Sequence, residues 1–247
     1  MDLRAVLLVD SGGHPLQELA TRARRVGFRV LRAKTPEDAR EALRDRRHAI
    51  GAVVIPPDLG APDLALALEG FRELASDDSL SVLVAGPRPS PEACARLRAA
   101  GAELALFDPL DDHTLRFQLN RAVGARPASE AAQRRAVRVP ADWPVRVRMG
   151  PREKPARVYC VSATGAYLAT SRPSFRGSLL YLTLPLPNGP LEVAGRVVMT
   201  NVPGNLVREN LPLGMAVQFT GLAPEAESSL RRFTEQQDAT LCLATPR

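Results

Sequence analysis

The N-terminal half of the chain alternates short apolar runs with segments of helical spacing, and this alternation restricts its fold more than any other feature. The apolar runs have the length of buried strands, and the segments between them place apolar residues on one helix face. The expected strands are 5–10, 28–32, 52–55, 81–85 and 103–107, and the expected helices are 16–26, 36–47, 63–74, 91–100 and 111–123. This pattern predicts an α/β domain over residues 1–123, with a parallel sheet covered on both faces.

The pattern changes after residue 123. Residues 124–133 are small and polar without apolar periodicity, so we expect them to form a linker. From Pro144 onward the apolar residues alternate as they do in half-buried strands. The expected strands are 145–149, 156–161, 166–170, 178–184, 191–200 and 214–219, followed by a helix over 224–236. These elements predict a small β-barrel with a C-terminal helix over residues 134–236, and a tail over 237–247.

The positive charge of the chain is concentrated beside the predicted start of the barrel. Residues 1–126 hold 18 Lys+Arg and 18 Asp+Glu, whereas residues 127–247 hold 15 and 9, which supplies the whole net charge of +6. Residues 134–157 alone carry eight basic and two acidic side chains, a difference that is again +6. A short basic segment of this kind favours an anionic partner, either a phosphate-bearing ligand or a nucleic acid.

Composition and motifs exclude several other classes of function. No secretory leader or membrane-length apolar run is evident, and the three cysteines are too widely spaced for a disulfide framework or a zinc cluster. His14, His48 and His113 are scattered, and no Gly-rich phosphate loop follows a strand. We therefore expect a cytoplasmic protein that is not an enzyme and carries no metal or cofactor.

The order and length of the first half resemble the receiver domain of two-component response regulators, which has flavodoxin-like topology. The most specific local match is the sequence Gly-Ala-Glu-Leu-Ala-Leu-Phe-Asp-Pro-Leu-Asp at residues 101–111. It corresponds to the last strand of the family and the loop that follows. The resemblance implies a pseudo-receiver, because the residues that carry receiver chemistry are replaced in this chain.

Four departures lead to that expectation. The phosphate-pairing lysine of the family becomes Asp108, and the paired acids that hold Mg²⁺ are reduced to Asp10 followed by Ser11. The phosphoacceptor position falls in Ile-Pro-Pro at residues 55–57, with Asp58 two residues past the expected site, and the switch hydroxyl becomes Ala85. We expect this domain to accept no phosphoryl group and to act as a docking or dimerising module.

The second half carries a split motif. Arg134 and Arg138 form Arg-x-x-x-Arg, with Arg135 between them, and about two dozen residues later Ser162 and Gly165 form Ser-x-x-Gly. Together with Gly-Met-Ala-Val-Gln-Phe at 214–219, they resemble the signature of PilZ domains, the cyclic di-GMP receptor family. In that family the arginines lie on an arm before the first barrel strand. The first slot of the second motif is usually Asp or Asn, and here it is Cys160.

The resemblance implies a ligand site for cyclic di-GMP made by Arg134, Arg135, Arg138, Cys160, Ser162 and Gly165. Arginine can neutralise a phosphate and read guanine O6 and N7 with paired donors. A thiol in place of a carboxylate is a weak acceptor for guanine N–H groups, so it weakens or abolishes binding. Alternatively, Ser162 is an ordinary turn hydroxyl and Gly165 an ordinary hairpin glycine.

The sequence thus favours a bacterial signalling adaptor in which cyclic di-GMP folds the arginine arm onto the barrel and alters the placement of the receiver-like domain. A protein partner would sense this change, and a homodimer is possible. The alternative is a messenger-independent scaffold whose arm contacts a protein or a membrane surface. Nucleic-acid binding is disfavoured, because few aromatic residues lie between the arginines.

Overall fold

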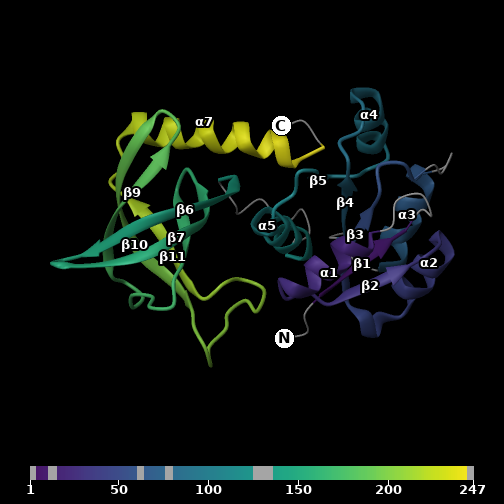
Figure 1. Ribbon diagram of the computed structural model, residues 1–247, viewed down its shortest axis with the longest axis horizontal. Coiled ribbons are helices and arrows are strands. Elements are labelled where there is room, and N and C mark those ends of the chain that lie inside the picture. Colours follow the sequence, from purple (N-terminus) through teal and green to yellow (C-terminus); the bar gives the residue numbers. More distant parts are fainter. Residues whose placement is uncertain (1–3, 11–15, 60–63, 76–79, 125–135, 244–247) are drawn as a thin grey trace. The chain divides into compact units, whose positions relative to one another are not determined.

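The chain folds into two compact units, as expected from the sequence. The computed structural model describes residues 4–10, 16–59, 64–75, 80–124 and 136–243 (Figure 1). One unit comprises residues 1–134 together with 239–247, and the other comprises residues 135–238.

The first unit is built on a parallel sheet in the order β2-β1-β3-β4-β5. The strands are β1 (Ala5–Val9), β2 (Val30–Ala33), β3 (Ile50–Ile55), β4 (Ser81–Gly86) and β5 (Leu104–Phe107). Strand β1 is buried along its whole length, and so is β3 after Ile50, because helices cover both faces of the sheet. This order is the flavodoxin-like arrangement, so the fold class predicted for the first half is confirmed.

Helices divide between the two faces of this sheet (Figure 1). The helices are α1 (Gln17–Arg25), α2 (Pro36–Arg44), α3 (Leu64–Ala75), α4 (Pro91–Ala99) and α5 (Asp112–Val123), with a 3₁₀ turn, η1, at Arg46–His48. Helices α2, α3 and α4 contribute to one apolar core, and α1 and α5 contribute to the other. Thr35 begins α2 with a capping box, and Ser90 caps the first turn of α4, so local sequence also fixes where these helices start.

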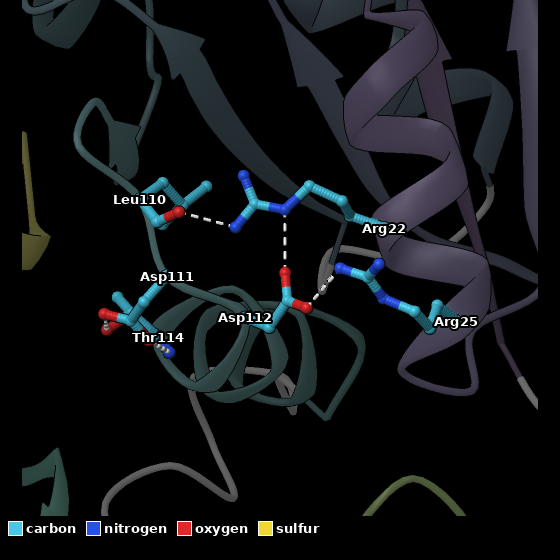
Figure 2. A network of polar contacts seen from close by, with 6 residues as sticks. All are labelled: Arg22, Arg25, Leu110, Asp111, Asp112 and Thr114. Atoms are coloured by element: carbon cyan, nitrogen blue, oxygen red, sulfur yellow. Dashed lines mark hydrogen bonds and ion pairs between the residues drawn. The ribbon is translucent and has the colours of Figure 1, made fainter.

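A polar network joins the C-terminal turn of α1 to the N-terminal turn of α5 (Figure 2). Arg22 donates through Nε to Asp112 Oδ1 at 2.7 Å, and Arg25 donates to Asp112 Oδ2. These hydrogen bonds, that of Arg22 first, lower the pKa of Asp112. Asp111 caps α5 by accepting from the backbone N–H of Thr114 at 2.7 Å. Basic groups at a helix C-terminus and acidic groups at an N-terminus both complement the helix dipoles, so the network fixes α5 against α1.

The second unit is a closed barrel in the order β10-β11-β8-β7-β6-β9. Its strands are β6 (Arg138–Met149), β7 (Arg152–Ser162), β8 (Gly165–Ala169), β9 (Leu179–Leu186), β10 (Gly189–Asn201) and β11 (Gly214–Thr220). Alternation of burial is clearest in β9, where Leu180, Leu182, Leu184 and Leu186 face the interior. The barrel that we predicted for the second half is therefore confirmed.

The first barrel strand is longer than the sequence indicated. We expected it to begin near Pro144, but β6 begins at Arg138. The ladder between β6 and β7 shifts between Pro140 and Trp143, and Asp142 lies between them with a positive φ of 47°. This bulge, together with prolines at 140 and 144, breaks the alternation by which a strand is recognised.

The C-terminal helix α7 (Pro224–Leu241) also continues beyond its expected end at residue 236. Its buried residues in the barrel unit are Leu230, Thr234 and Asp238, and Phe233 contacts the ring of Trp143 with centroids 5.4 Å apart. The chain after Asp238 belongs with the first unit, where Cys242 pairs with Leu104 of β5 in an antiparallel bridge. Residues 239–243 are therefore part of the α/β unit, and the part of the expected tail after residue 243 lies outside the described residues.

Candidate functional site

Arg138 is an exposed residue at the start of β6, directly opposite Ser162 on β7. The expectation that Arg138 precedes the first strand is therefore wrong, because this residue is held in the barrel ladder. Arg134 and Arg135 lie outside the described residues. Opposed residues of an antiparallel ladder project from the same face, so the structure brings Arg138 and Ser162 together as the split motif implies.

Ser162 ends β7 at a tight hairpin that leads into Gly165, the first residue of β8. The side chain is 2% exposed, and its hydroxyl donates to the carbonyl of Gly165 at 3.2 Å. The same oxygen accepts from the backbone N–H of Thr164 at 3.4 Å. The hydroxyl therefore stabilises its own turn.

Gly165 is needed for packing between strands. A Cβ atom at this position would stand 2.5 Å from the carbonyl oxygen of Val217 on β11, which is far inside van der Waals contact. The reason is close approach of the neighbouring strand, since Gly165 has no positive φ. This glycine of the motif therefore has a structural function whether or not a ligand binds.

Cys160 lies two residues before Ser162 on β7, where it faces Pro140 of β6 and Tyr167 of β8. The side chain is buried, and burial raises the pKa of its thiol to about 11, although the charge of Arg138 and the backbone N–H of Tyr167 act in the opposite direction. The thiol is therefore neutral at physiological pH.

Two further residues extend the site and were not recognised from the sequence. Gly165 pairs with Gln218 of β11, and Gln218 pairs with Arg196 of β10, so a single cross-strand row continues from Arg138 and Ser162. Both new side chains are exposed, and Arg196 donates through Nη1 to the carbonyl of Gly177 at 2.9 Å. Each of these side chains alternates with buried neighbours along its predicted strand, 191–200 or 214–219, and this pattern indicates that it is exposed. The pattern does not indicate which strands become neighbours, so the sequence could not place the two residues beside the motif.

The basic segment that the sequence placed beside the motif is spread along a long hairpin. Arg146 and Arg148 follow Arg138 on the same strand, which places them about 25 to 35 Å further along at 3.3 Å per residue. Arg146 forms an ion pair of 3.0 Å with Glu153, and Arg157 pairs with Asp142 at 2.9 Å. Only part of the positive excess can therefore serve a ligand at Arg138.

A groove of about 920 Å³ opens on the barrel away from the motif. Strands β6 and β9 pair only at Val147–Leu182 and Arg148–Tyr181, and the groove lies where they separate. Its lining includes Arg146, Arg148, Glu153, Tyr181, Thr183 and Glu192. Of the motif residues that the structure describes, which are Arg138, Cys160, Ser162 and Gly165, none lines the groove.

In the α/β unit, Asp10 is engaged by the protein itself. Its carboxylate accepts from the backbone N–H of Leu16 at 2.8 Å and forms an ion pair with Arg32 of β2. Asp58 and Asp108 are exposed at the same carboxyl edge of the sheet, and Ala85 is buried. The positive charge beside Asp10 is thus the side chain of Arg32, and Asp108 adds an exposed carboxylate at this edge of the sheet.

The second unit is a closed barrel with Arg138 at the head of its first strand and a Ser-x-x-Gly hairpin beside it. Residues 132–236 match the family model of the PilZ domain. The second unit is thus a PilZ domain, of the cyclic di-GMP receptor family that the sequence motif resembles, and it is joined to a receiver-like α/β domain. The search of curated proteins gave no match.

Solved structures show similarity at low identity. The inhibitor of motility MotI/DgrA of Bacillus subtilis is 21% identical, with 44% of this chain and 52% of that chain covered and a TM-score of 0.37. This chain thus matches about half the length of that protein. A CheY-like receiver domain protein of Methanospirillum hungatei is 16% identical, with 50% of this chain and 95% of that chain covered and a TM-score of 0.41. The protein named putative pilus assembly-related protein, of Burkholderia pseudomallei, is 22% identical, with 49% of this chain and 90% of that chain covered and a TM-score of 0.41.

Helices long and apolar enough to cross a membrane are absent from the described part of the chain.

Proposed function

We propose that this protein is a cytoplasmic bacterial signalling adaptor whose PilZ barrel binds cyclic di-GMP and whose receiver-like domain contacts a protein partner without accepting a phosphoryl group. The observation that carries the proposal is the adjacency of Arg138 and Ser162 in one ladder of a PilZ barrel. Cys160 and Gly165 belong to the same small region of β7 and β8.

The chemistry of the ligand suits these side chains. Cyclic di-GMP presents two phosphates and two guanines, and a guanidinium can bind a phosphate oxygen pair or the O6 and N7 edge of guanine with two parallel hydrogen bonds. Arg138 is exposed and would provide one such group, and Arg134 and Arg135 would provide others. Ser162 would exchange its bond to the Gly165 carbonyl for one to the ligand. Gln218 and Arg196, exposed in the same row, would border the bound nucleotide.

Signal transmission in this proposal depends on the position of the arginines in the chain. Arg134 and Arg135 follow directly on the linker over residues 124–133. A ligand that binds these side chains together with Arg138 would restrain the linker, and a partner of the receiver-like domain would sense the change.

Loss of Arg138 is expected to weaken cyclic di-GMP binding about 10- to 30-fold, because a charge-assisted hydrogen bond contributes about 1.5 to 2 kcal/mol. Calorimetric titration of the wild type and Arg138→Ala measures this effect. Arg146→Ala is the matched control, since it removes an exposed arginine from the same strand far from Ser162. Equal affinities for the wild type and Arg138→Ala would exclude the proposed arginine site.

The receiver-like domain is expected to remain unphosphorylated. Asp10 is paired with Arg32, and Asp108 would repel an incoming phosphoryl group. Incubation with acetyl phosphate followed by intact-mass measurement tests this, with an unmodified chain as the expected result. A chain carrying one added phosphoryl group on a peptide that contains Asp10 or Asp58 would refute this part of the proposal.

The messenger-independent scaffold is the second candidate, and two observations favour it. The Ser162 hydroxyl is already satisfied within its hairpin, and the thiol of Cys160 is buried and neutral. If the wild type gives no binding heat while Cys160→Asp binds, the site has lost its messenger and the scaffold function is correct.

A further inference from the structure

The end of the barrel at the tip of the β6–β7 hairpin carries a highly exposed aromatic side chain. Residues 170–178 connect β8 to β9 there, and Phe175 within this loop is 87% exposed. Its neighbour Ser174 is 5% exposed, so the two adjacent side chains point in opposite directions, the serine inward and the phenylalanine into water. An exposed apolar residue indicates an interaction site where further apolar side chains extend it into a patch with a polar rim.

The loop that carries Phe175 is held in place by several hydrogen bonds. Lys154 Nζ donates to the carbonyl of Arg172 at 2.6 Å and to Ser174 Oγ at 2.8 Å. Gly177 donates its backbone N–H to Val197 at 2.7 Å, and its carbonyl accepts from Arg196. These bonds hold the backbone of the loop on both sides of Phe175, which lowers the entropy that binding would cost.

Further apolar side chains surround the base of this loop. Leu179, Tyr181 and Val198 are 40%, 43% and 38% exposed on the strands that the loop joins or contacts. Leu179 pairs with Arg196 in the β9–β10 ladder, so apolar and basic groups are direct neighbours. The ring of Tyr181 lies under the guanidinium of Arg148, at 5.4 Å from its centroid.

This end of the barrel is also strongly basic. The segments 148–154, 170–178 and 196–198 contain six basic residues, namely Arg148, Arg152, Lys154, Arg172, Arg176 and Arg196, and one acid, Glu153. Glu153 is already paired with Arg146 at 3.0 Å. The surface that surrounds Phe175 therefore attracts anions.

We propose that this end of the barrel binds an anionic lipid surface, with Phe175 inserted among the lipids and the arginines around it facing the headgroups. A projecting aromatic residue ringed by basic side chains is suited to the interface of a bilayer, where the ring leaves water and each cation meets a negative headgroup. A single-stranded nucleic acid would need several open rings for stacking, and the ring of Tyr181 is already covered by Arg148. The residues of the split motif lie outside the segments that carry these basic side chains, and Arg196 is the side chain shared with the row that continues from Ser162.

Co-sedimentation with vesicles of phosphatidylcholine containing about 30% phosphatidylglycerol tests the proposal, with pure phosphatidylcholine vesicles as reference. We expect the full chain to bind the anionic vesicles and to be released by high salt. Phe175→Ser should reduce partitioning about 10- to 100-fold, and Arg176→Ala about 5-fold. Leu66→Ala, which removes an exposed apolar side chain from the α/β unit, is the control for Phe175→Ser. Arg96→Ala, which removes an exposed arginine from the same unit, is the control for Arg176→Ala, and both controls should bind vesicles as the wild type does.

Insertion of the ring has its own measurement. In a Trp143→Phe background, Phe175→Trp places the only tryptophan on the loop, and its emission should shift to shorter wavelength with anionic vesicles. Binding that does not depend on Phe175, equal binding to pure phosphatidylcholine, or no binding at all would overturn the proposal. A duplex or single-stranded oligonucleotide that binds with the same dependence on Phe175 would instead identify a nucleic-acid site. Far-ultraviolet circular dichroism of each variant checks that the barrel is folded.

Discussion

Replacing Cys160 with Asp is expected to tighten cyclic di-GMP binding about 10- to 150-fold, because it restores a charged acceptor for the guanine N–H groups. The same change should destabilise the ligand-free barrel by about 1 to 3 kcal/mol, since position 160 is buried. Opposite effects on affinity and on stability are what distinguish a ligand position from a packing position.

Calorimetry gives the affinity and urea unfolding gives the stability. Cys160→Ser supplies an uncharged step between thiol and carboxylate and should fall between the two in affinity. Cys94→Asp adds the same charge on α4 of the α/β unit and should leave cyclic di-GMP binding unchanged. A Cys160→Asp variant that folds but binds no more tightly than the wild type would show that position 160 does not contact the ligand.

Much of the α/β unit could be predicted because each of its elements carries its own local signal. Thr35 and Pro36 mark the start of α2, and Ser90 with Pro91 marks the start of α4, so the predicted and observed starts agree. The buried strands are short apolar runs that only a covered sheet accommodates. Differences there are confined to the ends of elements, such as β3, which begins at Ile50 instead of residue 52.

The barrel site was predicted less completely, because it depends on which strands become neighbours. The motif placed Arg138, Cys160, Ser162 and Gly165 in one region, and the ladders agree with that placement. The sequence could not show that the Ser162 hydroxyl is bound within its own turn, or that Gly165 is required by the carbonyl of Val217. Both facts arise from contacts between segments whose pairing the sequence pattern does not specify.

The basic segment illustrates the same limit. In the sequence, its charges lie within and directly beside the split motif. In the structure, Arg138 and Arg148 lie near opposite ends of β6, a strand of 12 residues. One charge cluster in sequence thus becomes two surfaces in space. One of them borders the proposed messenger site, and the other surrounds Phe175.

A substitution in residues 239–243 is expected to destabilise the α/β unit strongly, because these residues cover the open edge of its sheet. Strand β5 is an edge strand, and the carbonyl of Glu103, the residue before it, accepts from the backbone N–H of Leu243 at 2.9 Å. Leu243 packs into the core beside α2 to α4 and Cys242 packs into the core beside α1 and α5, which is the alternation of a strand. Leu243→Ala is therefore expected to destabilise the α/β unit by about 2 to 5 kcal/mol.

Hydrogen exchange of the amides in β5 and in residues 239–243 measures this effect locally, which matters because two units need not unfold together. Loss of protection in these segments is expected for Leu243→Ala, whereas Leu66→Ala, which alters a 67% exposed side chain on α3, should leave them protected. Unchanged protection in Leu243→Ala would mean that the segment does not cover the edge.

Gln118 provides a second way to release the same segment. Its side chain is fully buried in α5 and donates through Nε2 to the carbonyls of Ala105 at 3.0 Å and Leu241 at 2.7 Å. Gln118→Met keeps the volume but leaves both carbonyls without this donor, at an expected cost of about 1 to 3 kcal/mol. Because each substitution frees the same anchor, the double variant with Leu243→Ala should lose less stability than the sum of the two single variants. If the losses in free energy of unfolding of the two single variants are strictly additive in the double variant, Gln118 and Leu243 stabilise the sheet independently. Residues 239–243 would then not act as one cooperative strand.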